Sequence, residues 1–154
     1  MRLDVLCVCR RPPPWVRDTT SDYSQRLPRD LTLEFAYVAP GRDSVSAAER
    51  RRDEGLRLLK RIKPATRLIA LDERGTEVDS PTVARWLRDW RTDATPVTFA
   101  IGGADGLDSV ILSHAERQWS LSRLTLPHLI VQILVAEQIY RAWSIDDGHP
   151  YHRA

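Results

Sequence analysis

Short β-type segments alternate with helical segments along this chain, and this alternation constrains the fold more than any other feature. Apolar, β-branched stretches occupy residues 2–9, 31–39, 66–72, 96–103 and 118–122. Between and after them, apolar residues recur at helical spacing, which predicts helices over 15–27, 46–62, 80–90, 107–115 and 129–143. Strands that alternate with helices predict an α/β fold with a mainly parallel sheet.

Two of the predicted helices carry recognisable start signals. Ser46 and Glu49 have the spacing of a capping box, and Leu56, Leu59 and Ile62 are expected to form the apolar face of that helix. Ser80 is the expected cap of the helix over 80–90, with Pro81 at its first position.

Composition limits the protein class. A length of 154 residues, 42% of them apolar, predicts one domain over 1–154 with one sizeable core. No stretch approaches the apolar length of a membrane span, and the first residues lack the long apolar region of a secretory signal, so we expect a cytoplasmic protein. Cys7 and Cys9 occupy alternate positions of a strand and are expected to be small core residues; no metal site is predicted.

The charge distribution leaves two interpretations open. A net charge of +2 does not by itself indicate a polyanionic partner. The segment around the second helix nevertheless concentrates cations: Arg50, Arg51, Arg52, Arg57, Lys60, Arg61 and Lys63. They form either a solvated helix face or a nucleic-acid contact.

Three loops follow predicted strands and form the candidate ligand site, because ligands of such sheets bind beyond the carboxyl ends of the strands. They are the end of the third strand at Leu71, "IGGADGL", and "SLSRLTLPH". Gly102 and Gly103 leave the backbone bare, although a tight turn would explain them equally. The leucine-rich third loop would suit an adenine ring and a thioether better than a phosphate.

Four motifs in the last third of the chain carry a resemblance to a known family: "IGGADGL", "WSLSRLTLPH", "LVAEQIYRAWSI" and "HPYHR". In this order they resemble the end of the RlmH family, the large-subunit ribosomal RNA pseudouridine N3-methyltransferases of the SPOUT class. The upstream half agrees in layout, through "PPPWV", "APG", the basic helix and "LD". Two departures are "GGADG" in place of Gly-Gly-Pro-Glu-Gly, and "CVCRR" where the family has a glycine.

The resemblance implies a fold, a cofactor and an assembly. It implies a SPOUT-type α/β fold with a C-terminal trefoil knot, whose pocket holds S-adenosylmethionine largely through backbone groups. The residues that the resemblance assigns to this pocket are Leu71, Gly102, Gly103, Leu121, Ser122, Arg123, Leu124, Thr125 and Leu126. It further implies a homodimer that acts on large-subunit ribosomal RNA, and we expect the assembled ribosome to be the substrate.

The same resemblance implies that the tail reaches the partner's active site and helps to hold the target base. Tyr151 could stack on a base, and Arg153 could hold a phosphate or a base edge. Methylation at N3 of pseudouridine releases a proton, and His152 and His128 are the candidates for accepting it, because histidine titrates near neutrality. His128 could instead be a structural residue at a helix start, and the sequence does not decide which residue is the base.

Two other functions remain open at this point. The chain could be a catalytically impaired RNA- or ribosome-binding module of the same fold, with the altered glycine loop as the reason. It could also be a SPOUT methyltransferase for another RNA.

Overall fold

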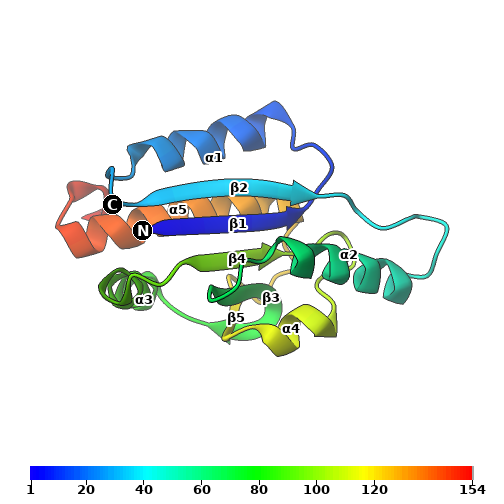
Figure 1. Cartoon of the computed structure of the whole chain (residues 1–154). Coiled ribbons are helices and arrows are strands. Elements are labelled where there is room, and N and C mark those ends of the chain that lie inside the picture. The colour runs from blue at the N-terminus through cyan, green and yellow to red at the C-terminus, as the bar shows by residue number, and fades with distance from the viewer. Residues whose placement is uncertain (154) are drawn as a thin grey trace.

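The computed structural model describes residues 1–153 and contains one five-stranded sheet (Figure 1). The strands are β1 (Arg2–Val8), β2 (Thr32–Val38), β3 (Arg67–Glu77), β4 (Val97–Ile101) and β5 (Arg117–Ser120). Their order is β2-β1-β4-β3-β5, and every neighbouring pair is parallel. The predicted α/β fold with a parallel sheet is confirmed; the trefoil knot stays a prediction.

Helices cover both faces of the sheet. They are α1 (Pro14–Arg26), α2 (Ala47–Arg61), α3 (Ser80–Asp93), α4 (Ser109–His114), α5 (His128–Asp147) and the short 3₁₀ helix η1 (Pro150–Arg153). One apolar cluster joins the sheet to α3 and α5 and to the end of α1, and a second joins it to α2 and α4. No helix within residues 1–153 combines the length and the apolarity that a membrane crossing requires.

Strand β1 shows how the sheet serves both clusters. Leu3, Val5 and Cys7 belong to the cluster under α3 and α5, whereas Leu6 and Val8 belong to the other. Cys9 joins the first cluster just beyond the strand, and both thiols are free and buried. Their predicted role as small core residues is confirmed, and burial raises the pKa of the Cys7 thiol well above its ordinary value.

Strand β3 is longer than its apolar pattern predicts. The sequence predicts a strand over 66–72, but the strand continues to Glu77 through an irregularity. Leu71 and Thr76 both pair with Trp119, so the residues between them bulge out of the sheet. Gly75 permits the return to β5, because a Cβ there would lie 2.5 Å from the carbonyl oxygen of Gln118.

One of the two predicted caps is confirmed and the other is wrong. The Ser46 hydroxyl accepts a hydrogen bond from the Glu49 backbone N–H at 3.2 Å. Helix α3 is capped by Asp79, whose carboxylate accepts from the Thr82 N–H at 2.9 Å. Ser80 instead donates its hydroxyl to Oε1 of Gln138 on α5 at 2.7 Å, so it joins two helices.

The buried side of α2 also differs from the prediction. Leu58 is 1% exposed, whereas Leu56, expected on the apolar face, is 42% exposed. Gly55 is the physical reason, because a Cβ there would lie 2.8 Å from Cγ1 of Val110 on α4, so α4 packs directly on the α2 backbone. This contact turns Glu54 inward as well, and Glu54 is 4% exposed.

Candidate active site

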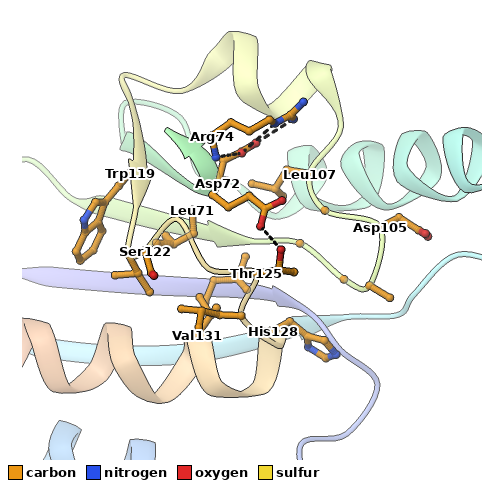
Figure 2. Close-up of a pocket in the computed structure, with 18 of the residues that line it drawn as sticks. Leu71, Asp72, Arg74, Asp105, Leu107, Trp119, Ser122, Thr125, His128 and Val131 are labelled. Carbon is orange, nitrogen blue, oxygen red and sulfur yellow. Dashed lines mark hydrogen bonds and ion pairs between the residues drawn. The ribbon is translucent and has the colours of Figure 1, made fainter. Parts of the chain in front are cut away.

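A cavity of about 400 Å³ lies at the bulge of β3, beyond the end of β4 and beside the start of α5 (Figure 2). This volume is within the range of small-molecule sites. The three loops that the sequence singled out all contribute to its wall. Of the residues predicted for the site, nine line it: Leu71, Gly102, Gly103, Leu121, Ser122, Leu124, Thr125, Leu126 and His128.

Arg123 is the one predicted cofactor residue that does not line the cavity. Its side chain is 93% exposed and forms an ion pair with Glu77 at 3.0 Å. Leu124, its neighbour, is 71% exposed and lines the cavity. The chain between Ser120 and Thr125 therefore turns some side chains toward the cavity and others toward solvent.

The loop after β5, "SLSRLTLPH", is held in place by hydrogen bonds of its serine hydroxyl groups. The Ser120 hydroxyl contacts the carbonyl oxygens of Glu73 and Ser122, at 3.1 and 2.9 Å. The Ser122 hydroxyl accepts from the Leu124 N–H at 3.0 Å. The loop is thus tied to the bulge of β3, which forms the neighbouring wall.

The glycine loop "IGGADGL" is a tight turn, and its backbone leaves no room for a side chain at Gly102. Gly103 and Gly106 form an isolated bridge, and the Gly106 N–H donates to the Gly103 carbonyl at 3.1 Å. A Cβ on Gly102 would lie 2.5 Å from the carbonyl carbon of Gly106, a backbone atom that cannot move cheaply. A Cβ on Gly103 would meet a side chain, Cγ1 of Val8, at 3.1 Å. Close approach of the chain to itself therefore accounts for Gly102.

Asp105, the acid of "GGADG", ties the glycine loop to the basic helix. Its carboxylate pairs with Nε of Arg50 at 2.8 Å, with both side chains 22% exposed. The hydrogen bond from Arg50 holds the pKa of Asp105 below its ordinary value. The shorter acid of this chain thus still reaches a partner on α2.

The bulge of β3 adds two acids that the sequence analysis did not assign to the site. Burial raises the pKa of Asp72, but hydrogen bonds from the Arg74 side chain and backbone outweigh this effect and bring the pKa below its ordinary value. Oε2 of Glu73 accepts the Thr125 hydroxyl at 2.8 Å, the contact drawn in Figure 2. The signal for them was weak, because "ERGTE" has the composition of an ordinary loop.

His128 is the first residue of α5 and lies at the edge of the cavity (Figure 2). Burial lowers the pKa of its imidazole, and the charge of Glu54 raises it by less. A pKa below the ordinary value leaves the ring mostly neutral at pH 7, as a proton acceptor must be.

The tail folds against the opposite end of α5. Tyr151 stacks edge-on against Tyr140 with ring centroids 4.6 Å apart. Its hydroxyl donates to Oε1 of Glu137 at 3.0 Å and lies within hydrogen-bond distance of the Tyr23 hydroxyl, at 3.3 Å. Burial raises the pKa of Tyr151, and these hydrogen bonds raise it further. His152 lies 3.4 Å from the Ser144 hydroxyl through Nδ1, and Arg153 is exposed.

One protomer does not bring the tail and the cavity together. Helix α5 has 20 residues, so its two ends lie roughly 30 Å apart. Figure 1 shows the strand tips on one side of the molecule and the C-terminal segment on the other. Of the four predicted catalytic residues, His128 lies at the cavity, and Tyr151, His152 and Arg153 lie at the far end.

Some arginines of the basic helix α2 are bound within the chain, and another faces the cavity. Arg50 pairs with Asp105, and Arg57 donates to the carbonyls of Ala39 and Pro40 at 2.7 and 2.8 Å. Arg51 lines the cavity. Within residues 1–153, no cluster of three or more histidine, cysteine, aspartate or glutamate side chains is arranged to hold a metal ion.

Comparison with known proteins identifies the family. The family model described as "Predicted SPOUT methyltransferase" matches residues 1–152. The chain is a member of the SPOUT methyltransferase family. Three relatives of this SPOUT protein carry the name "Ribosomal RNA large subunit methyltransferase H".

These relatives match over essentially their whole length. The protein of Chromohalobacter salexigens is 44% identical over 99% of this chain and 100% of its own. That of Polynucleobacter asymbioticus is 42% identical over 99% of both chains, and that of Alkalilimnicola ehrlichii is 44% identical over 100% of both. The family resemblance derived from the four sequence motifs is confirmed.

Proposed function

We propose that this chain transfers a methyl group from S-adenosylmethionine to N3 of a pseudouridine in large-subunit ribosomal RNA, with the assembled ribosome as its substrate. The observation that carries the proposal is the full-length identity of 42–44% to proteins named as large-subunit ribosomal RNA methyltransferases. A protein that modifies ribosomes would work in the cytoplasm.

The cavity supports S-adenosylmethionine as the methyl donor. Leu71, Leu121 and Leu126 offer apolar surface for the adenine ring and the thioether, and the backbone at Gly102 and Gly103 carries no side chain. Three carboxylates also line it. Asp72 and Asp105 pair with arginines, whereas Glu73 accepts the neutral Thr125 hydroxyl and suits a ligand that carries a sulfonium and an ammonium charge. The cofactor supplies an activated methyl group, so the protein needs only to orient the two reactants and accept a proton.

The outer side of α5 supports a homodimer. Ile130 is 36% exposed, and Ile133 and Leu134 are half-buried on the side of α5 away from the sheet. In a two-fold symmetric dimer with antiparallel α5 helices, the end of one helix lies beside the start of the other. Such a dimer would bring Tyr151, His152 and Arg153 of one protomer toward the cavity of its partner.

The decisive experiment is to incubate the protein with labelled S-adenosylmethionine and ribosomes and to map the label. We expect one N3-methylated pseudouridine in the large-subunit RNA, and its absence from ribosomes of a deletion strain. Label on another RNA would instead support a SPOUT methyltransferase of different specificity. Ribosome binding without calorimetric binding of S-adenosylmethionine would support an impaired binding module, for which the "GGADG" loop is the motivating observation.

Assembly is tested separately by sedimentation. We expect a dimer at micromolar concentration, and a monomer would contradict a composite site.

A further inference from the structure

A second cavity of about 340 Å³ adjoins the first behind the glycine loop. The two share part of their wall, at Gly103, Ala104, Asp105 and His128. Glu54 of α2 lines the second cavity only. His128 therefore stands between the candidate cofactor site and a buried carboxylate.

Glu54 is an unexpected residue at this position. It lies within the cationic segment of α2, where a solvated side chain is the ordinary outcome, yet it is 4% exposed. Its Oε2 accepts the Gly41 N–H at 2.9 Å. Its Oε1 is buried and has no hydrogen-bond partner among residues 1–153. A buried carboxylate oxygen of this kind requires a partner, because desolvation of an unpaired polar atom is costly.

The nearest cation of α2 does not supply that partner. Arg50, one turn before Glu54, gives its Nε to Asp105 at 2.8 Å and its Nη1 to the Val45 carbonyl at 2.7 Å. The other charged side chains around this cavity are Arg10, Arg11 and Asp43.

His128 offers the complementary group. Its Nδ1 is also buried without a hydrogen-bond partner in the described part of the chain. Both side chains line the second cavity, and the charge of Glu54 raises the pKa of His128. The other charged groups that line the larger cavity with His128 are Arg51, Asp72, Glu73, Arg74 and Asp105. Asp72 and Arg74 pair with each other.

We propose that Glu54 is a positioning residue that holds His128 in the tautomer with the proton on Nδ1, through a hydrogen bond to Oε1 that a bridging water or a small rotation of either side chain completes. This inference rests on the proposed function. A carboxylate accepts only from a protonated Nδ1, so Nε2 is left without a proton and can act as the base. The same division of roles between a carboxylate and an imidazole operates in other transferases and hydrolases.

In the methyl transfer, each bond that forms is matched by a bond that breaks. The N3–H bond of the target base breaks, and its proton passes to Nε2 of His128. The electron pair left on N3 forms the new bond to the methyl carbon, and the carbon–sulfur bond breaks with its pair going to sulfur. His128 returns the proton to solvent, and Glu54 takes no part in the proton transfer.

The test is the tautomer of His128, read from long-range nitrogen–proton correlation spectra of the histidine-labelled protein and assigned with a His128→Asn variant. We expect the Nδ1–H form in the wild-type protein. Glu54→Gln keeps an oxygen for the Gly41 N–H and presents an NH₂ group to Nδ1, so the ring should switch to the Nε2–H form. Because the charge of Glu54 raises the pKa of His128, removing it should lower that pKa further.

Activity gives a second reading. With ribosomes as substrate, Glu54→Gln should lower kcat by at least about tenfold with little change in KM, since a wrongly protonated base impairs the chemical step. Glu54→Asp retains the charge and should keep the Nδ1–H form. Asp105→Asn removes another carboxylate from the same cavity and is the matched control, with the tautomer unchanged.

The outcomes separate the inference from the proposed function. An Nε2–H ring in the wild-type protein overturns the inference even if Glu54→Gln does not fold. An unchanged tautomer and pKa in a folded Glu54→Gln protein also overturn it. A wild-type protein that does not methylate ribosomal RNA overturns the proposed function, and the spectra still report whether Glu54 positions His128.

Discussion

The two ends of α5 are built in different ways. At its start, the cavity wall consists of three loops, bare backbone and half-buried side chains such as His128. At its end, Tyr151 is locked in an aromatic cluster with Tyr140 and hydrogen-bonded to Glu137. The start of α5 borders an open cavity, whereas the end of α5 packs against the tail segment that contains Tyr151. In the structure the tail is therefore held by its own chain, one helix length away from the cavity.

Deleting residues 149–154 should have the largest effect on this comparison. We expect methyl transfer to fall by more than about a hundredfold, equivalent to about 2.7 kcal/mol, while calorimetric affinity for S-adenosylmethionine is unchanged. The dimer should persist, with a small loss of stability because Tyr151 no longer packs on Tyr140.

Mixing subunits sharpens the same test. A tail-deleted subunit paired with a Gly103→Val subunit has one intact cavity, whose tail must come from the other chain. Activity should return in the mixture and not in either parent. Heterodimers that form but remain inactive would show that the tail acts within its own subunit or outside the site.

At the cavity end, Gly102→Ala should be the most damaging small change. The new Cβ would meet Gly106 backbone at 2.5 Å, so the loop must open. We expect the affinity for S-adenosylmethionine to fall at least tenfold, or about 1.4 kcal/mol, by calorimetry. Gly103→Ala is the matched control, because its Cβ meets side chains and no backbone: Cγ1 of Val8 at 3.1 Å, and the Glu54 carboxylate at ordinary contact distance. An equal or larger loss there would contradict the steric argument.

At the tail end, Arg153→Ala should act on RNA alone. Arg153 is exposed, so the thermal midpoint should not change. Loss of one charge-assisted contact to RNA predicts a rate lower by roughly ten- to a hundredfold, or about 1.5–3 kcal/mol. Unchanged rates on ribosomes would remove Arg153 from the site.

The smallest effect is expected from Asp105→Asn. The Arg50 pair depresses the pKa of Asp105, so its stabilisation is present above the unfolded-state pKa and is lost as the pH falls through the folded-state value. Solvent still reaches both side chains and screens the pair, so the effect on stability should be small. Urea unfolding should show the variant weaker than wild type at neutral pH and equal to it in acid; an equal difference at both would contradict the pair.

The spacing of apolar residues predicted most strands and helices correctly, but it did not predict the cap of α3 or the polar end of β3. Strand and helix positions followed from spacing, because burying one face of each element imposes it. The cap of α3 was misassigned, since Asp79 and Ser80 are equally good cap types and only the contact of Ser80 with Gln138 separates them. The continuation of β3 to Glu77 was missed because a polar stretch can pair at a sheet edge when Gly75 permits close approach.

The sequence by itself determined the fold class, the family and the three loops of the cavity, because these depend on local patterns and on motifs in a fixed order. Tertiary structure alone decided which side chains meet: that Arg50 holds Asp105, that Glu54 turns inward against the His128 neighbourhood, and that the tail lies a whole helix away from the cavity. The physical reason is packing. Gly55 lets α4 approach α2, and this contact sets the rotation of α2 that buries a charged residue no periodicity would select.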